Sequence, residues 1–117
     1  MELYYTPRAR NDLANIKESV IEKFDDENLA IEVLKKITKT VRHLIVFPYL
    51  GQEVSEITGI YTEYRCLFCE KNYVFYRVEA DRICVIRVLN EKQDYIQYIL
   101  APLNQCLQCS DLLILQL

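Results

Sequence analysis

Residues 61–89, YTEYRCLFCEKNYVFYRVEADRICVIRVL, determine the fold that the sequence predicts. Three runs rich in aromatic and β-branched residues lie at 61–69, 73–80 and 83–89. The polar stretch EKN joins the first two runs, and ADR leads into the third. Such runs with tight polar turns between them are typical of consecutive hairpins. The stretch therefore predicts a three-stranded antiparallel meander.

The N-terminal part of the chain predicts a short strand followed by a helix. LYY (3–5) has strand-forming residues, and Thr6 followed by Pro7 is typical of a helix start. A threonine hydroxyl caps free backbone N–H groups, and proline fits the first helical position. Apolar residues then recur at helical spacing, at Leu13, Ile16, Val20 and Phe24.

A second helix is predicted after the polar stretch DDEN (25–28), which offers capping residues. Its apolar stripe consists of Ala30, Val33, Leu34, Ile37, Val41 and Leu44, and we expect Pro48 and Gly51 to end it. Two amphipathic helices with so short a link should form an antiparallel hairpin. A short helix is expected over EKQDYIQYIL (91–100), ended by Pro102, so the sequence predicts one α+β domain over residues 1–100.

Alternation along the three strands predicts where the arginines lie. Because successive side chains of a strand point to opposite faces, helices can cover one face while the other stays open. We expect the helix-covered face to hold Tyr64, Cys66, Phe68, Val74, Tyr76, Val78, Cys84, Ile86 and Val88. Arg65, Arg77 and Arg87 should then meet on the open face, beside Tyr73 and residues 90–95. Arginines beside aromatic rings suit phosphate, nucleotide or carboxylate binding, whereas solvated or salt-bridged arginines would have no such role.

Composition limits the classes of function. With 117 residues, 51% of them hydrophobic and 26% charged, the chain has a globular composition, and no apolar run reaches the roughly 20 residues of a membrane span. The N-terminus MELYYTPRAR lacks a basic-then-apolar signal, so we expect a cytoplasmic protein with reduced cysteines. The net charge of −3 argues mildly against a dedicated nucleic-acid binder, since phosphate contacts require a basic surface.

Several stretches, in this order and spacing, carry a resemblance to a known family. They are YYTPRARNDLANI (4–16), HLIVFPYLG (43–51), EYRCLF (63–68), YVFYRV (73–78) and IRVLNEKQDYIQYIL (86–100). Over residues 2–100 the chain resembles the toxins of bacterial RelE/ParE type II toxin–antitoxin systems. The resemblance implies a strand–helix–helix–three-strand fold with a small C-terminal helix, and a cognate antitoxin protein that wraps and blocks the toxin.

The same resemblance implies one of two activities. ParE-like toxins stop growth by poisoning DNA gyrase and have no nuclease activity, whereas RelE-like toxins cleave mRNA in the ribosome. A homologue that only binds its antitoxin is a third alternative. None of the three requires a cofactor.

The resemblance also implies candidate site residues. The candidates for catalysis are Arg65, Arg87, Lys92 and Tyr95, and those for target binding are Tyr73, Arg77, Asn90, Gln93 and Asp94. Leu67 and Val74 stand where the RelE nuclease pattern has basic residues. RVLN (87–90), followed by Gln93 and Asp94, is similar to the ending of ParE-like members. The sequence therefore favours gyrase binding over RNA cleavage.

His43 and the cysteines each have a functional and a structural interpretation. His43 is the sole histidine, and its place near the end of the second helix favours a helix-end cation over an acid–base catalyst. Cys66 with Cys69 and Cys106 with Cys109 form two C-x-x-C pairs that would suit a four-thiolate zinc site. Residues three apart in a strand face opposite sides, however, so buried thiols and no metal site are expected.

The tail APLNQCLQCSDLLILQL (101–117) lies beyond the family pattern and ends in the apolar run LLILQL. Left exposed, such a run would be prone to aggregate. We expect it to dock on the face that the antitoxin would bind, or to form a contact in a homodimer.

Overall fold

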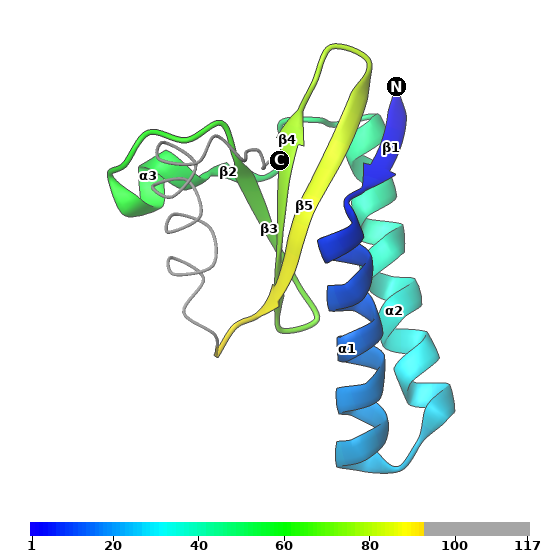
Figure 1. Ribbon diagram of the computed structural model, residues 1–117. Coiled ribbons are helices and arrows are strands. Elements are labelled where there is room, and N and C mark those ends of the chain that lie inside the picture. Colours follow the sequence, from blue (N-terminus) through cyan, green and yellow to red (C-terminus); the bar gives the residue numbers. More distant parts are fainter. Residues whose placement is uncertain (93–117) are drawn as a thin grey trace.

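The computed structural model describes residues 1–92 and contains the predicted N-terminal strand, helix pair and three-stranded meander, with the strands in one sheet (Figure 1). The elements are β1 (Glu2–Tyr5), α1 (Pro7–Phe24), α2 (Glu27–Arg42), the 3₁₀ turn η1 (His43–Ile45), β2 (Gln52–Glu53), α3 (Val54–Thr58), β3 (Arg65–Cys69), β4 (Asn72–Val78) and β5 (Arg82–Asn90). The tail 101–117, and all but the first two residues of the helix expected over 91–100, lie outside the described residues.

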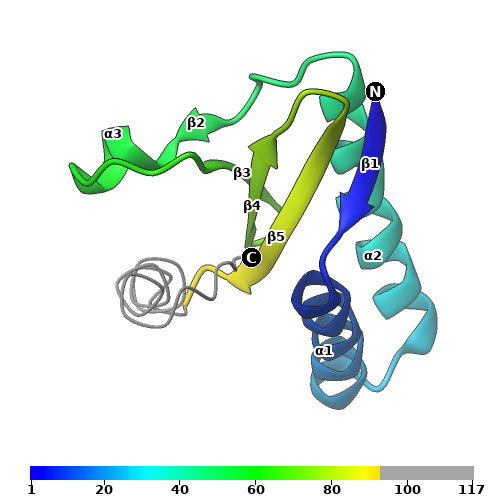
Figure 2. The ribbon, with the colours of Figure 1, turned by 45° about the horizontal axis from the view of Figure 1, so that its top comes forward.

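The sheet has five strands in the order β1-β5-β4-β3-β2. The predicted meander is confirmed, because β3 pairs antiparallel with β4 and β4 antiparallel with β5. Two pairings were not predicted: β1 adds to β5 in parallel, and the two-residue β2 adds to the outer edge of β3. Figure 2 shows β2 and α3 on the side of the sheet away from the helix pair.

Tight turns join the meander strands. Cys69 pairs with Asn72, which leaves Glu70 and Lys71 as a two-residue turn with φ values of 51° and 64°. Positive φ at both positions is the type I′ geometry that matches the twist of a hairpin. The Asn72 side-chain amide donates to the Glu70 carbonyl at 2.7 Å and supports this turn.

Both helix starts are capped by side chains. The Thr6 hydroxyl accepts the Ala9 N–H at 3.0 Å, as predicted, and donates to the Ile86 carbonyl at 2.8 Å. It therefore caps the N-terminus of α1 and hydrogen-bonds this end of the helix to β5. At α2, Asp26 accepts the Leu29 N–H at 3.0 Å.

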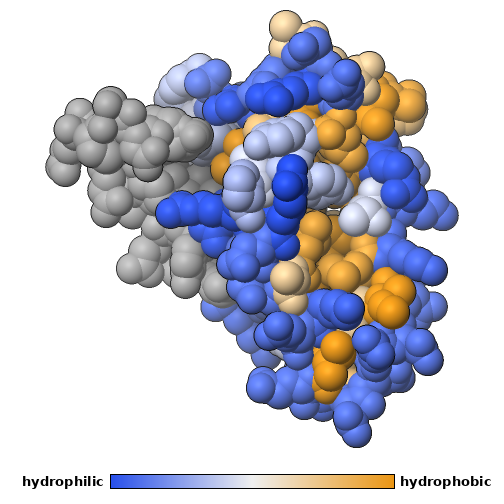
Figure 3. Space-filling model, turned by 45° about the vertical axis from the view of Figure 1, so that its right-hand side comes forward, coloured by the Kyte–Doolittle hydropathy of each residue, from blue (hydrophilic) through white to orange (hydrophobic). Residues whose placement is uncertain are grey.

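The main core lies between the helix pair and one face of the sheet. From α2 and η1, Ile37, Val41 and Leu44 are fully buried there, each contributing about 1.5–3 kcal/mol relative to an exposed side chain. One expectation was wrong: α2 ends at Arg42, earlier than Pro48. Phe24, the last residue of α1, is 56% exposed. Apolar patches are visible between the charged side chains on the side of the molecule shown in Figure 3.

The faces assigned to β3 and to much of β5 were wrong. Toward the helices point Leu67 and Cys69 of β3, Val74, Tyr76 and Val78 of β4, and Ile83, Val85 and Val88 of β5. Away from them point Tyr64, Cys66, Phe75, Cys84, Ile86 and Leu89, which form a second cluster with Val54. The assignment for β4 is confirmed. Alternation failed in β5 because this strand is apolar on both sides, so its pattern does not identify the helix-facing side. A bulge near Ile86 also shifts the register.

Candidate functional site

Arg87 joins the sheet to the first helix. Its Nε and Nη2 donate to the two carboxylate oxygens of Asp12 at 2.8 and 3.0 Å, and the Val88 N–H donates to the same carboxylate at 2.9 Å. The side chains of Arg87 and Asp12 are only 14% and 8% exposed. The expectation of a surface arginine was therefore wrong, because Arg87 forms a bidentate ion pair that holds α1 against β5.

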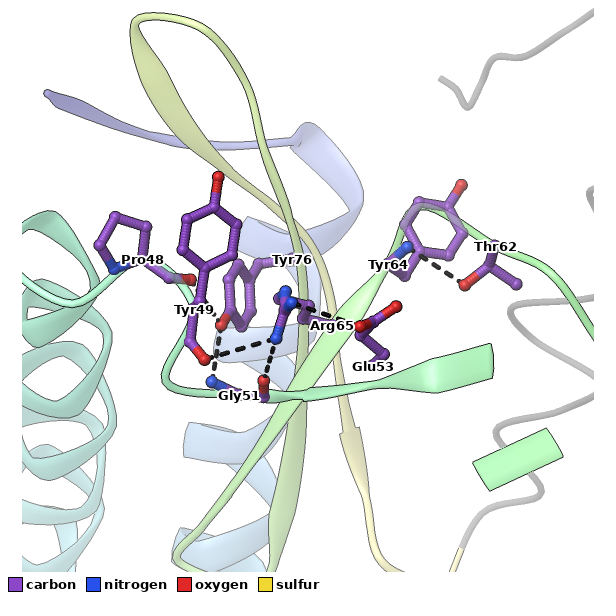
Figure 4. A network of polar contacts seen from close by, with 8 residues as sticks. All are labelled: Pro48, Tyr49, Gly51, Glu53, Thr62, Tyr64, Arg65 and Tyr76. Carbon is purple, nitrogen blue, oxygen red and sulfur yellow. Dashed lines mark hydrogen bonds and ion pairs between the residues drawn. The ribbon is translucent and has the colours of Figure 1, made fainter. Parts of the chain in front are cut away.

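The hydroxyl of Tyr76 fixes the chain after α2 (Figure 4). It donates to the Pro48 carbonyl at 2.8 Å and accepts the Gly51 N–H at 2.8 Å. Burial raises the pKa of this phenol, partly offset by the bond from Gly51, so the donating proton is retained at neutral pH. Gly51 is required here, since a Cβ at this position would lie 2.7 Å from both the Tyr76 hydroxyl and the Cys66 carbonyl.

Arg65 completes this network from β3. Its Nη1 donates to the Gly51 carbonyl at 2.7 Å and to the Tyr49 carbonyl at 3.4 Å. The guanidinium also lies over the Tyr49 ring, 4.9 Å from its centroid, and 3.6 Å from the Glu53 carboxylate. Arg65 is thus bound to residues 49–53, which lie between α2 and α3, as Figure 4 shows.

Arg77 belongs to a third cluster, at the β4–β5 turn. Arg77 and Arg82 both donate to the Glu79 carboxylate, each at 2.6 Å at closest. Burial alone would raise the pKa of Glu79, but hydrogen bonds from Arg82 and Arg77 outweigh it, and the pKa is lowered. Arg82 also lies over the Tyr4 ring, with 4.5 Å from the guanidinium carbon to the ring centroid.

The expected convergence of Arg65, Arg77 and Arg87 is therefore wrong. Each arginine binds a different acceptor, and strand alternation places Arg65 and Arg77 on opposite faces of the sheet. The physical reason is that the chain supplies a carboxylate or carbonyl group beside each guanidinium.

Three other predicted site residues, Tyr73, Asn90 and Lys92, lie where β4 begins and β5 ends. Tyr73 packs edge-on against Phe68, with ring centroids 5.1 Å apart, and pairs with Leu89 across the strands. Asn90 ends β5, and its side-chain oxygen accepts the Lys92 N–H at 2.9 Å. Gln93, Asp94 and Tyr95 lie outside the described residues.

The cysteines within residues 1–92 are free thiols, of which Cys66 and Cys84 are buried and Cys69 is half-buried. Cys66 lies in the cluster away from the helices, and Cys69 packs toward them with its Sγ 3.4 Å from the Thr40 hydroxyl. The prediction that these two face opposite sides is confirmed. Burial raises the pKa of Cys66 and of Cys84, which disfavours reactive thiolates. Among residues 1–92, no three histidine, cysteine or acidic residues are grouped so as to hold a metal ion.

Sequence analysis missed a surface formed by residues 43–64, which we call the connecting segment. Exposed apolar side chains gather in it: Ile45, Val46, Phe47, Tyr49, Leu50, Ile57, Ile60 and Tyr61. The sequence does contain a signal for this surface. The stretch HLIVFPYLG (43–51) is as apolar as α2, but its apolar residues are consecutive and lack helical spacing, so one helix face cannot bury them all. His43 lies at the end of α2, as expected, and begins this segment.

Comparison with known proteins identifies relatives of this fold. Residues 3–95 match the family model described as ParE toxin of type II toxin-antitoxin system, parDE. Two solved structures share the fold. "Chromosomal ParDE TA system from P. aeruginosa" is 22% identical with a TM-score of 0.65, over 77% of this chain and 95% of that chain. "YoeB/ParE toxin from Agrobacterium tumefaciens" is 17% identical with a TM-score of 0.50, over 77% and 98%.

These similarities confirm the predicted fold class, and at such identities the two solved structures bear on the fold alone. No curated protein sequence matches the chain. Among the described residues, no helix is both long and apolar enough to cross a membrane.

Proposed function

The chain belongs to the ParE toxin family of type II toxin–antitoxin systems, and on that premise we propose that it inhibits growth by binding DNA gyrase. The observation that carries this proposal is the engagement of the sheet arginines within the chain. Arg65 is bound to the connecting segment, Arg77 to Glu79 and Arg87 to Asp12. Cleavage of mRNA in the ribosome would require cations gathered around a phosphate, and these three are held apart. Action by binding a protein fits this arrangement better.

Membership in a type II system implies an antitoxin partner. We propose that this antitoxin neutralises the toxin by lying across the helix pair. Phe24 and Ile31, near the α1–α2 connection, are 56% and 38% exposed, and further apolar patches are visible in Figure 3. An amphipathic segment of the antitoxin would bury such positions. Because gyrase acts on the chromosome, the proposal also places the protein in the cytoplasm.

The test is induced expression with and without the protein encoded by the adjacent gene. We expect growth arrest with DNA breaks when the toxin is expressed alone, and rescue by co-expression. The purified toxin should inhibit supercoiling by purified gyrase, and the purified antitoxin should reverse that inhibition.

Three outcomes would contradict parts of the proposal. Growth arrest with cleaved ribosome-bound mRNA and normal supercoiling would favour the RelE-like ribonuclease. Normal growth, with a stable antitoxin complex, would identify an inactive homologue that only binds its antitoxin. Lack of a complex with the adjacent gene product would show that this product is not the antitoxin.

A further inference from the structure

Exposed apolar side chains are concentrated in the connecting segment. Of the twelve large hydrophobic side chains that are exposed within residues 1–92, eight belong to residues 43–64. Val46, Phe47, Tyr49 and Tyr61 are between 62% and 82% exposed. Exposed apolar side chains concentrated in one segment of a small domain mark that segment as a candidate surface for another molecule.

The connecting segment is held in one shape, which distinguishes it from a loose loop. Tyr76 fixes Pro48 and Gly51 through its hydroxyl, and Arg65 fixes the carbonyls of Tyr49 and Gly51 (Figure 4). These four bonds leave the rings and aliphatic chains between them exposed. A surface ordered before binding loses less conformational entropy when a partner arrives.

The second half of the segment is anchored in a similar way. Val54, at the start of α3, is 1% exposed and belongs to the second core cluster. Gly59 ends α3 with a φ of 76°, and the Thr58 hydroxyl accepts the Ile60 N–H at 3.2 Å. Ile60 and Tyr61 are therefore presented on an ordered turn that Val54 attaches to the sheet.

The charge of the segment indicates the chemistry of its partner. Residues 43–64 carry Glu53, Glu56 and Glu63 and neither lysine nor arginine. Glu53 is paired with Arg65, so Glu56 and Glu63 are the acidic groups that the segment offers to a partner. An acidic and apolar surface repels nucleic-acid phosphates. It complements a protein segment in which lysine or arginine alternates with apolar side chains.

We propose that the connecting segment is the surface with which this toxin binds its cellular target protein, through a basic and apolar segment of that target. This inference rests on the proposed function and adds the part of the toxin that performs it. The antitoxin contacts proposed above lie elsewhere, near the α1–α2 connection, which Figure 1 shows at the opposite end of the helix pair from this segment.

The first test replaces exposed apolar side chains. The double variant Val46→Ser/Phe47→Ser is expected to bind gyrase at least about tenfold more weakly, because anchors of this kind dominate interface affinity. The matched control is Phe24→Ser/Ile31→Ser, which removes two exposed apolar side chains from the proposed antitoxin surface. The control should keep gyrase affinity and weaken the antitoxin complex, and each variant should melt within a few degrees of the wild type.

The second test reverses charge. Glu56→Lys/Glu63→Lys should weaken target binding, with a smaller dependence of affinity on salt than in the wild type. Both glutamates are exposed and belong to no ion pair reported for residues 1–92. A loss of affinity would therefore not come from a broken ion pair.

Growth inhibition provides a measurement that does not depend on the identity of the target. If the wild type arrests growth without binding gyrase, and Val46→Ser/Phe47→Ser abolishes that arrest, then the gyrase proposal fails and the surface assignment stands. If the variant binds gyrase and arrests growth as the wild type does, the surface assignment is overturned and the gyrase proposal stands. Loss of antitoxin binding alone in this variant would show the antitoxin to be the occupant and would also overturn the inference. A wild type that neither binds gyrase nor slows growth would overturn both.

Discussion

Arg87→Ala is expected to destabilise the fold strongly, and the structure sets the size of the effect. Removing one partner of a buried ion pair costs about 3–5 kcal/mol, because the other charge stays buried without its partner. Asp12 is 8% exposed on its side chain, so water compensates little. It keeps the Val88 N–H at 2.9 Å, which favours the lower end of that range, about 3 kcal/mol. At roughly 4 °C for each kcal/mol in a domain of this size, the melting temperature should fall by about 12 °C.

Urea unfolding followed by circular dichroism measures this effect, and a double-mutant cycle isolates the pair. Arg87→Met and Asp12→Leu each leave one buried charge, whereas the double variant leaves neither, so it should be more stable than either single variant. Arg77→Ala is the control and should cost less than about 1 kcal/mol, since Glu79 is more exposed and keeps Arg82. A loss below about 1 kcal/mol for Arg87→Ala would refute the argument. Growth assays with Arg87 variants require the unfolding measurement as a control, because a variant that does not fold would also lose toxicity.

Three further outcomes follow from local geometry. Gly51→Ala should melt well below the wild type in a thermal scan, since its Cβ would overlap the Cys66 carbonyl and the Tyr76 hydroxyl. An unchanged melting temperature would contradict the close packing of these two groups against Gly51. Lys71→Gly should stabilise the protein by about 1 kcal/mol in urea unfolding, because Lys71 has a φ of 64°, while Lys71→Ala should give no gain. The lowered pKa of Glu79 means that its ion pairs stabilise the fold above the ordinary value of 4.5, and that this stability is lost as pH falls through the lowered pKa. Glu79→Gln should therefore flatten the stability profile in the acid range, and an unchanged profile would count against this assignment.

The local features of the fold were predictable because short-range chemistry determines them. Thr6 and Pro7 predict the start of α1, since capping and proline geometry involve only neighbouring residues. The turn after Cys69 was predicted from its polar residues for the same reason. The parallel pairing of β1 with β5 depends instead on residues about 80 positions apart, and no local pattern specifies it.

The candidate site was less predictable, for two physical reasons. Strand β5 is buried on both faces, so alternation along it could not assign Arg87 to an open surface. The partners of the arginines also come from distant positions, as Asp12 does for Arg87. Alternation on β4 succeeded, since Val74 and Tyr76 do face the helices.

The attachment of the N-terminus to β5 has a consequence for how the protein is made. Thr6 bonds to Ile86 and Asp12 to Val88, so both wait for residues that the ribosome adds roughly 75–80 positions later. At about 5–20 residues per second, that interval is on the order of 4–16 s. During it β1 has no strand to join and the Asp12 carboxylate has no Arg87. The first strand and the first helix are therefore made several seconds before the strand that completes their hydrogen bonds, so this part of the fold cannot close until β5 has been synthesised.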